Sequence, residues 1–470
     1  MILRNYQEEF LNKLRKSFLS NKNILGVLPT GAGKTVIISA ITQLAQQKGN
    51  RVYIFAHRIE LIEQISSALH SFNIQHSLVL PDYPVNNNCL VQVCSVDTFI
   101  RRVNNYLPPD LIIVDEAHHL ASATNKWGRC VSAFPNARIL GLTATPVRTN
   151  GQGLGRMCGG LFDDLIVGCS VEWLIANNYL TDAKYFVPPQ IVDLTGVRTL
   201  GGDYNQNELE QRLNQSIVTG DAIAHYSRIC PKAPAIAFCA SIRHAQAVAS
   251  EFSANGFNSD IIHGGLNKVT RKNLITALAN NEINVLTSVD VVSEGTDIPV
   301  VETGILLRPT QSLALHLQMI GRMLRISKGK NHAYILDHVG NTLRHGFADT
   351  PREWSLSGTK KSRKNQEPTI PMKQCPNCYC CHKPAPACPT CGHKYKTETK
   401  KLKTEKGELK ELTKEEREFL KIKQKKEIKK ASSLNELREI EKKRGFKKGW
   451  ADHVWAGKLL KREKINAMRG

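Results

Sequence analysis

One segment of this chain has the residue types and spacing that bind a nucleotide phosphate. LPTGAGKT, residues 28–35, follows an apolar run and precedes a helical pattern. Glycines in such a loop let backbone N–H groups approach phosphate oxygens, and the N-terminus of the following helix adds partial positive charge. We expect Lys34 to reach the terminal phosphates and Thr35 to hold Mg²⁺, although the general pattern has Gly where this chain has Leu28. The other expected loop residues are Pro29, Thr30, Gly31, Ala32 and Gly33.

An acidic pair stands further along the chain, in DEAHHL at residues 115–120, directly after the apolar run LIIV. In phosphoryl transfer such a pair can do two jobs. Asp115 would steady Mg²⁺, and Glu116 would orient and deprotonate the attacking water. An Asp-Glu pair alone is usually a solvated loop, but downstream of a phosphate-binding loop it predicts nucleotide hydrolysis.

Two arginines follow in SLALHLQMIGRMLR, residues 312–325. On a helix, Gln318, Arg322 and Arg325 fall at i, i+4 and i+7, on one face. An arginine supplied from outside the phosphate-binding lobe stabilises the charge of phosphoryl transfer by roughly 10³ to 10⁵ in rate. Hydrolysis would then require a closed cleft. The alternative is a surface helix with paired charges.

Six of the 13 cysteines lie between residues 374 and 395. Two Cys-x₂-Cys pairs separated by nine residues suit a tetrahedral Zn²⁺ ribbon. The expected ligands are Cys375, Cys378, Cys388 and Cys391, and the residues that could substitute for them, though we expect them to be bystanders, are Cys380, Cys381 and His382. A redox dithiol is the alternative. The ribbon would guide nucleic acid or dock a partner protein.

Elements that could position these groups appear as short β-branched runs alternating with helical patterns. Near-continuous apolar runs of this kind are typical of parallel strands covered on both faces. The alternation fills the first 165 residues, lapses, and resumes at AIAFCA, residues 235–240. The fold class is therefore α/β, with two parallel-sheet lobes and a ligand cleft between them.

The pattern divides the chain into six parts. They are a first lobe over 1–165, a linker or insertion over 166–230, a second lobe over 231–345, a linker over 346–370, a zinc ribbon over 371–395 and a basic helical region over 396–470.

Charge is unevenly distributed along the 470 residues. Residues 351–470 carry 33 Lys and Arg against 15 Asp and Glu, a net charge of +18, whereas the first 350 residues have a net charge of +4. A basic region of this density favours nucleic acid over a membrane as partner. The chain has no secretory signal pattern at its start and no run of 18 apolar residues, so we expect a soluble protein of a reducing cytoplasm.

The basic region itself contains two helical patterns. LTKEEREFLKIKQKK, residues 412–426, carries a capping signature at Thr413 and Glu416 and could simply be a solvated Lys/Glu helix. In the second pattern, Trp450 and Trp455 are interleaved with lysines. These aromatics would contact nucleic acid or form the core of a small helical hairpin.

The order of these motifs resembles that of a known family. PTGAGKT, DEAH, GLTATP at 141–146, TSVDVVSEGTDIP at 287–299 and QMIGRMLR at 318–325 are similar to the motifs of DEAH-type superfamily 2 helicases, which have two RecA-like lobes. The resemblance covers residues 1–345. Within the superfamily the chain resembles the RadD-like DNA helicases of bacteria and their phages, which share a cysteine-pair module after the second lobe.

The resemblance implies further roles. An adenine-side motif would comprise Arg4, Tyr6 and Gln7, and ATP would also contact Gly295, Asp297 and Gln318. The residues that would link hydrolysis to strand movement are His118, Thr143 and Thr145. The residues that would contact nucleic-acid phosphates are Arg58, Ser95, Thr98, Ser241 and Thr287, although short hydroxyl residues after strands are often helix caps.

These observations predict an ATP-, Mg²⁺- and Zn²⁺-dependent DNA helicase or translocase that acts on single-stranded, duplex or branched DNA in replication, recombination or repair, with a replication or repair protein as a possible partner. The alternatives are an RNA helicase, a restriction-type translocase subunit and a nucleic-acid clamp that binds ATP without hydrolysing it. No nuclease constellation is evident after residue 345, and Glu116 with two arginines argues against a clamp.

Overall fold

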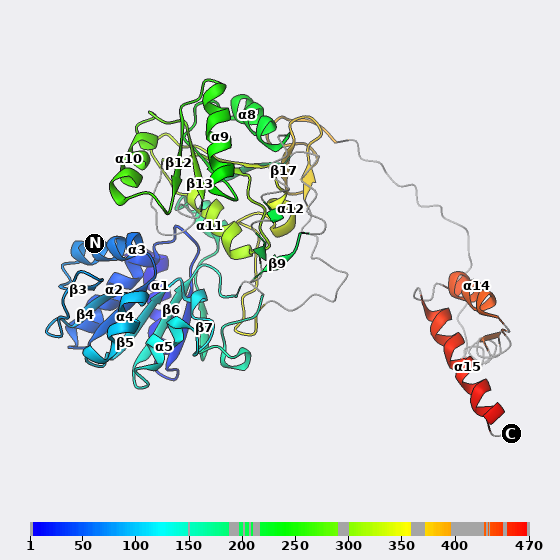
Figure 1. Cartoon of the computed structure of the whole chain (residues 1–470), viewed down its shortest axis with the longest axis horizontal. Coiled ribbons are helices and arrows are strands. Elements are labelled where there is room, and N and C mark those ends of the chain that lie inside the picture. The colour runs from blue at the N-terminus through cyan, green and yellow to red at the C-terminus, as the bar shows by residue number, and fades with distance from the viewer. Residues whose placement is uncertain are drawn as a thin grey trace. The chain divides into compact units, whose positions relative to one another are not determined.

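The protein is described by a computed structural model (Figure 1). The described residues are 3–148, 151–187, 197–200, 203–205, 208–209, 217–289, 300–358, 372–395, 427–428, 431, 433–444 and 449–467. They form two compact units, Met1–Tyr395 and Lys396–Gly470, each of which is considered by itself. No helix in these ranges is long and apolar enough to cross a membrane.

The first lobe is a parallel sheet flanked by helices. Its elements are α1 (Asn5–Ser17), β1 (Asn23–Val27), α2 (Lys34–Gln47), β2 (Val52–Ala56), α3 (Ile59–Ser71), β3 (Ser77–Val79), β4 (Val91–Ser95), α4 (Val96–Arg102), η1 (Val103–Asn105), β5 (Leu111–Asp115), η2 (Ala117–His119), α5 (Lys126–Ser132), β6 (Arg138–Thr143), η3 (Arg156–Cys158) and β7 (Asp164–Val167). Among the described residues the strand order is β3-β4-β2-β5-β6-β1-β7, with every pair parallel.

Strand register brings the motifs of this lobe together at the carboxyl ends of neighbouring strands. Every residue of β1, β2 and β4 is buried, as the apolar runs predicted. Val27 pairs with Thr143, and Asp115 pairs with Leu142. The phosphate-binding loop, the acidic pair and the GLTATP segment therefore begin side by side at the carboxyl ends of three neighbouring strands.

The second lobe is also a mainly parallel sheet. Its elements are β8 (Ala183–Phe186), α8 (Ile217–Ile229), β11 (Ala235–Phe238), α9 (Ile242–Ala254), β12 (Ser259–His263), α10 (Lys268–Ala279), β13 (Val285–Val289), β14 (Thr303–Leu306), α11 (Leu313–Met323), β15 (Ala333–Asp337) and α12 (Asn341–His345), with β16 (Lys373–Gln374) and β17 (Cys380–His382) from the cysteine-rich segment. The described strand order is β12-β13-β11-β14-β15-β8-β17-β16, and only the last two strands run antiparallel to their neighbours. The prediction of two parallel α/β lobes is confirmed.

The segment expected as a linker or insertion, 166–230, contains regular structure in its described residues. It contributes α6 (Val171–Ala176), β8, α8 and a small hairpin of β9 (Thr199–Leu200) and β10 (Asp203–Tyr204). β8 pairs in parallel with β15, so the second sheet begins before residue 231. Four residues without a flanking helical repeat gave too little periodicity to predict this strand.

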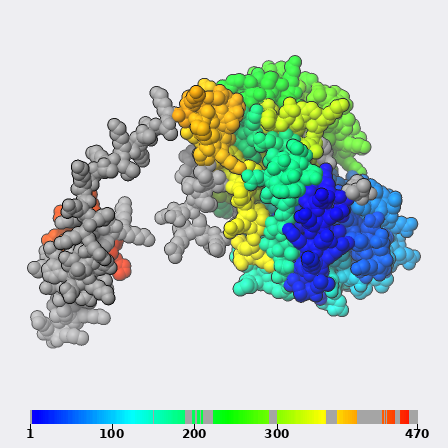
Figure 2. Space-filling model, turned by 180° about the vertical axis from the view of Figure 1, so that it is seen from behind, coloured from blue at the N-terminus to red at the C-terminus, as the bar shows by residue number. Residues whose placement is uncertain are grey.

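The segment after α12, also expected as a linker, returns to the first lobe. The backbone N–H of Gly155 donates to the Leu356 carbonyl at 3.0 Å, and Gln152 forms an isolated β-bridge with Gly358. Figure 2 shows this yellow segment running from the second lobe onto the cyan surface of the first. Residues 346–358 therefore tie the two lobes together.

The C-terminal unit contains a pair of helices, α14 (Leu434–Arg444) and α15 (Trp450–Ala467). Leu437, Ile440 and Ala451 are buried between them, and Trp450 and Trp455 pack against this cluster. The two tryptophans thus serve the core of a helical hairpin, which was the alternative interpretation. The helix expected over 412–426 lies outside the described residues.

Candidate active site between the lobes

Side chains of α1 form hydrogen bonds to the phosphate-binding loop. Gly31 and Gly33 have positive φ angles of 85° and 82°, which favour glycine. The Tyr6 hydroxyl and the Gln7 side-chain amide donate to the Ala32 carbonyl at 3.0 and 3.3 Å. A Cβ added at Gly33 would lie 2.5 Å from Gln7 Nε2, so a larger residue there would displace the Gln7 amide as well as strain the backbone. Gln7 therefore braces the loop, and its contact with a base stays a prediction.

An aromatic group adjoins the loop. The Arg4 guanidinium lies 4.6 Å from the centroid of the Tyr179 ring, which stacks at 5.9 Å on Trp173 and lies 5.1 Å from Tyr6. Tyr179 and Leu180 line the same cavity as Arg4 and Lys34. Sequence reasoning missed Tyr179 because it lies in the supposed linker; the two aromatics in WLIANNY were the only available signal.

The acidic pair lies opposite the loop lysine. Lys34 Nζ is 3.9 Å from Glu116 Oε1, and His118 Nδ1 is 3.4 Å from Glu116 Oε2. Glu116 adopts a left-handed conformation, with φ of 49°, and its N–H donates to Asp115 Oδ1 at 3.0 Å. Its carboxylate is thus placed between two potential cations and is 13% exposed.

A hydrogen-bonded path leads from Glu116 to β6. His118 Nδ1 lies 3.1 Å from the hydroxyl of Thr143, which accepts a hydrogen bond from the N–H of Thr145 at 3.1 Å. The three residues expected to couple hydrolysis to movement are therefore in contact. Thr143 and Thr145 are fully buried.

The second lobe closes the site through α11. A Cβ added at Gly321 would lie 2.6 Å from Thr30 Cβ, so this helix packs directly on the phosphate-binding loop. Arg322 and Arg325 line a cavity of about 320 Å³. Its other charged or loop residues include Arg4, Thr30, Lys34, Thr35, Asp115 and Glu116.

Ion pairs also join the lobes. Arg271 of α10 lies 2.5 Å from Glu60 of α3, and Lys268 pairs with Glu63 on the same two helices. Together with the packing of α11, these contacts give the closed cleft that the arginines require.

One described residue that was expected to bind ATP does not line this cavity. Gln318 is 4% exposed, does not line the cavity, and has no hydrogen-bond partner for Nε2 among the described residues. Gly295 and Asp297 lie outside the described residues.

The residues expected to contact nucleic acid differ in their exposure. Thr287 is fully buried and donates to the Asp260 carbonyl at 3.2 Å, so it cannot reach a strand here. Thr98 and Ser95 are also buried, and Ser241 caps α9 by accepting from the His244 N–H at 3.1 Å. Arg58, half-buried at the carboxyl end of β2, keeps the expected position, with Nε 3.3 Å from His57 Nε2. Burial contradicts the expectation for Thr287, Thr98 and Ser95, whereas the contacts of Ser241 and Arg58 with nucleic acid stay predictions.

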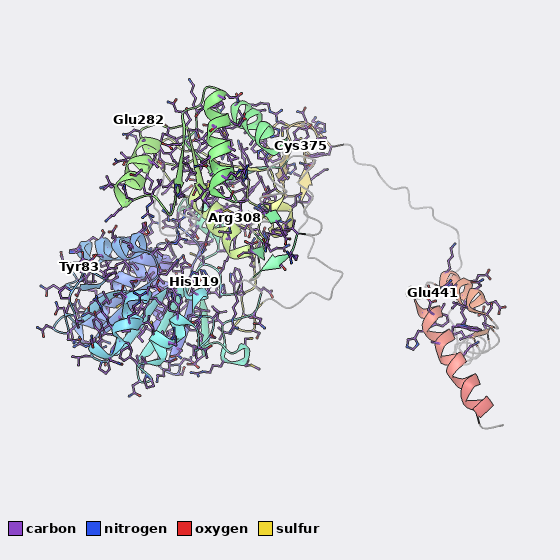
Figure 3. All side chains as sticks on the ribbon, in the orientation of Figure 1. Tyr83, His119, Glu282, Arg308, Cys375 and Glu441 are labelled. Atoms are coloured by element: carbon purple, nitrogen blue, oxygen red, sulfur yellow. The ribbon has the colours of Figure 1, made fainter. Side chains whose placement is uncertain are left out.

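The four expected zinc ligands converge. The Sγ atoms of Cys375, Cys378, Cys388 and Cys391 all lie within 4.8 Å of one another. The Cys375–Cys391 and Cys378–Cys388 distances are 3.6 and 3.7 Å, close to the ~3.8 Å that tetrahedral Zn–S bonds would impose. Figure 3 labels Cys375 in this cluster, in the segment that extends the second sheet.

The three bystanders have other contacts. Cys381 belongs to the apolar core, and Cys380 Sγ accepts from the Thr390 hydroxyl at 3.0 Å. His382 Nε2 lies 2.7 Å from the Tyr395 hydroxyl. All three are on β17, whose pairing with β8 explains why they are buried without belonging to the cluster.

This cavity fits the hydrolysis of a nucleoside triphosphate between two parallel α/β lobes. The fold and the site therefore place the protein in the class of two-lobe P-loop nucleoside triphosphatases. The family described as "Type III restriction enzyme, res subunit" matches residues 1–148, and "Helicase conserved C-terminal domain" matches residues 222–327.

Individual proteins agree with these matches. A "51.5 kDa protein" of a Lactococcus phage is 36% identical over 400 residues, covering 84% of this chain and 83% of its own. IRC3 of Saccharomyces cerevisiae, named as an ATP-dependent helicase, is 29% identical over 368 residues, 72% of this chain. The chain spans about half, 52%, of that yeast protein. The chain belongs to the superfamily 2 helicases and is an ATP-hydrolysing helicase.

Two solved structures share the fold. One is a fragment assigned to an HsdR subunit of a type I restriction enzyme from Vibrio vulnificus, with a TM-score of 0.58, 22% identity and coverage of 74% of this chain and 66% of that one. The other is the Type ISP restriction-modification enzyme LlaBIII bound to DNA, with a TM-score of 0.53, 16% identity and coverage of 72% and 28%.

Proposed function

We propose that this protein is an ATP- and Mg²⁺-dependent DNA helicase or translocase that remodels duplex or branched DNA in replication, recombination or repair. The observation that carries the proposal is one cavity lined by Lys34 and Glu116 from the first lobe and by Arg322 and Arg325 from the second. Because the two halves of this cavity belong to different lobes, hydrolysis and lobe movement are mechanically joined.

Each residue has a physical role in this mechanism. Lys34 and the loop amides would hold the phosphates, and Thr35 and Asp115 would hold Mg²⁺, which would supply positive charge to neutralise the developing negative charge. Glu116 orients and deprotonates water, a role for which its position in the cavity beside the phosphate-binding loop is suited. Arg322 and Arg325 stabilise the transferred phosphoryl group only when the cleft is closed.

Strand movement would follow from the contacts of Glu116. A change in its charge environment on hydrolysis reaches Thr143 through His118, and Thr143 in turn contacts Thr145. Thr145 stands directly before Pro146 at the end of the GLTATP segment, which leaves β6 beside the phosphate-binding loop.

DNA is proposed as the track for two reasons. Residues 351–470 have a net charge of +18, which suits a polyanion. Two relatives carry names that refer to DNA enzymes, the EcoAI type I restriction endonuclease subunit of Escherichia coli and the "DNA 3'-5' translocase XPB2" of Sulfurisphaera tokodaii. The cysteine cluster would hold Zn²⁺ and keep the ribbon folded as a platform for the strand or for a replication or repair protein.

The test is steady-state ATPase activity without polymer and with single-stranded DNA, duplex DNA, branched DNA or RNA. Strong stimulation by DNA alone supports the proposal, and the form that stimulates most identifies the track. Equal stimulation by RNA would favour an RNA or general nucleic-acid motor. Lys34→Ala is the control and should abolish turnover with every polymer while DNA binding remains.

A further inference from the structure

The loop after α11 contains a buried lysine to which the mechanism above gives no role. Lys330 lies between α11 and β15 and is 8% exposed. Its ammonium group donates to the backbone carbonyls of Val301 at 2.6 Å, Arg325 at 2.9 Å and Met323. Each of its three N–H groups therefore has a carbonyl acceptor.

One of these acceptors, Met323, is the last residue of α11, and Arg325 lies two residues beyond it. The last carbonyls of a helix have no partner within the helix, and positive charge near them interacts favourably with the helix dipole. Lys330 supplies both partner and charge to Met323 and Arg325. The intervening Leu324 carbonyl accepts from the N–H of Thr181 at 2.7 Å. The end of α11 is thus fixed by two separate segments.

The third acceptor joins this helix end to the sheet. Val301 is fully buried and stands two residues before β14, a strand between β11 and β15 in the second sheet. Lys330 therefore connects the end of α11 to the interior of the lobe, and the position of the helix end depends on it.

Arg325 links this connection to the cavity. Lys330 holds its backbone carbonyl, while Arg325 itself lines the cavity together with Lys34 and Glu116. Burial lowers the pKa of Lys330 to about 8, an effect that Glu302 opposes and Arg325 reinforces. The ammonium form, with all three donors, therefore prevails at neutral pH.

We propose that Lys330 is a positioning residue for ATP hydrolysis: it fixes the end of α11 so that Arg325 meets the transferred phosphoryl group in the closed cleft. This inference rests on the proposed role of Arg325. A displacement of a charged group by about 1 Å can cost on the order of 10²-fold in rate.

The experiment is a double-variant cycle on the full chain, comparing the ATPase activity of the wild type, Lys330→Met, Arg325→Ala and the double variant. Lys330→Met should lower kcat about 10- to 100-fold with a smaller change in the KM for ATP. In the Arg325→Ala background the same substitution should have no further effect, because the group that it positions is gone. Lys328→Met, at an exposed position of the same loop, is the matched control and should keep wild-type kcat.

Other results overturn the proposal. A wild-type kcat for Lys330→Met, or an equal loss in both backgrounds, would show that Lys330 does not act through Arg325. A wild-type kcat for Arg325→Ala would refute the role of that arginine and this proposal with it. That result differs from a wild-type kcat for Lys330→Met alone, which would refute only the role of Lys330. Circular dichroism checks folding. If Lys330→Met does not fold, Lys330→Gln, which retains an amide donor, enters the same cycle under the same criteria.

Discussion

The nucleotide cavity and the cysteine cluster are two sites of ionisable side chains that are assembled in opposite ways. The cavity draws on residues from Arg4 to Ile326, in both lobes. The four cysteines lie between positions 375 and 391 and converge through two tight turns. The first kind of site depends on the fold of the whole body, whereas the second would depend on the proposed Zn²⁺. Damage to one should therefore leave the other largely intact.

The largest expected effect is on the cavity. Glu116→Gln removes the proposed base and should lower kcat about 10²- to 10⁴-fold while ATP still binds, because the amide keeps the size of the side chain. Phosphate release measures turnover, and a fluorescent ATP analogue measures binding. Zinc content should not change.

Glu9→Gln, on the exposed face of α1, is the control for this variant and should behave as wild type. Normal phosphate release by Glu116→Gln would remove Glu116 from its proposed role.

The reciprocal experiment concerns the cluster. Elemental analysis of the reduced protein should find about one Zn²⁺ per chain, and Cys391→Ser should lose most of it, because a structural Zn²⁺ needs all four ligands. ATPase activity without polymer should persist, since no residue of 372–395 lines the nucleotide cavity.

Cys381→Ala is the control for the ligand set, because Cys381 is not one of the four expected ligands. This variant should keep its zinc. A folded, reduced protein without zinc would refute the metal site. Loss of basal ATPase activity in Cys391→Ser would instead show that the two sites are not independent.

The contrast also explains how much of the two sites could be predicted. The cysteine ligands were predictable because spacing alone determines which thiols can meet. The P-loop, the acidic pair and the arginines were predictable because each sits on a short motif. Tyr179 and Lys330 were not: nothing local distinguishes Lys330 from Lys328, two residues away, until the chain folds and buries one of them.

The fold shows the same limit. Long apolar runs identified most strands of both lobes, but β8 has four residues and only its pairing with β15 and β17 makes it a strand. The return of residues 346–358 to the first lobe is a tertiary contact without periodicity. The burial of Thr287 could not be predicted, because a hydroxyl facing a phosphate and one facing a buried carbonyl look alike in a sequence.

Acid should weaken the body through buried histidines. Burial, with His225 nearby, lowers the pKa of His338 to about 3, and burial lowers that of His345 to about 4. Their folded-state pKa values lie below the unfolded value of about 6.5, so stability is complete above that pH and falls as the unfolded chain takes up protons below it. Each group contributes up to about 1.4 kcal/mol per pH unit between pH 6.5 and its folded pKa.

Urea unfolding at pH 7.5, 6 and 5 measures this effect, and His338→Asn should flatten the slope. An unchanged slope would mean that His338 accepts its proton in the folded lobe. Metal release, measured at each pH, reports separately on the zinc site.

The smallest expected effect concerns closure of the cleft. Arg271→Ala removes the ion pair with Glu60 between α10 and α3, whose side chains are 21% and 29% exposed. Exposed ion pairs contribute about 0.2–1 kcal/mol, so the KM for ATP should rise only about 1.5- to 5-fold, and less at high salt. The exchange variant Glu60→Arg/Arg271→Glu should restore it, whereas Lys272→Ala, exposed on the same helix, should have no effect. If Arg271→Ala left KM unchanged at low salt, the pair with Glu60 would contribute nothing to closure of the cleft. Closure would then rest on the packing of Gly321 on Thr30, the Lys268–Glu63 pair and the return of residues 346–358 to the first lobe.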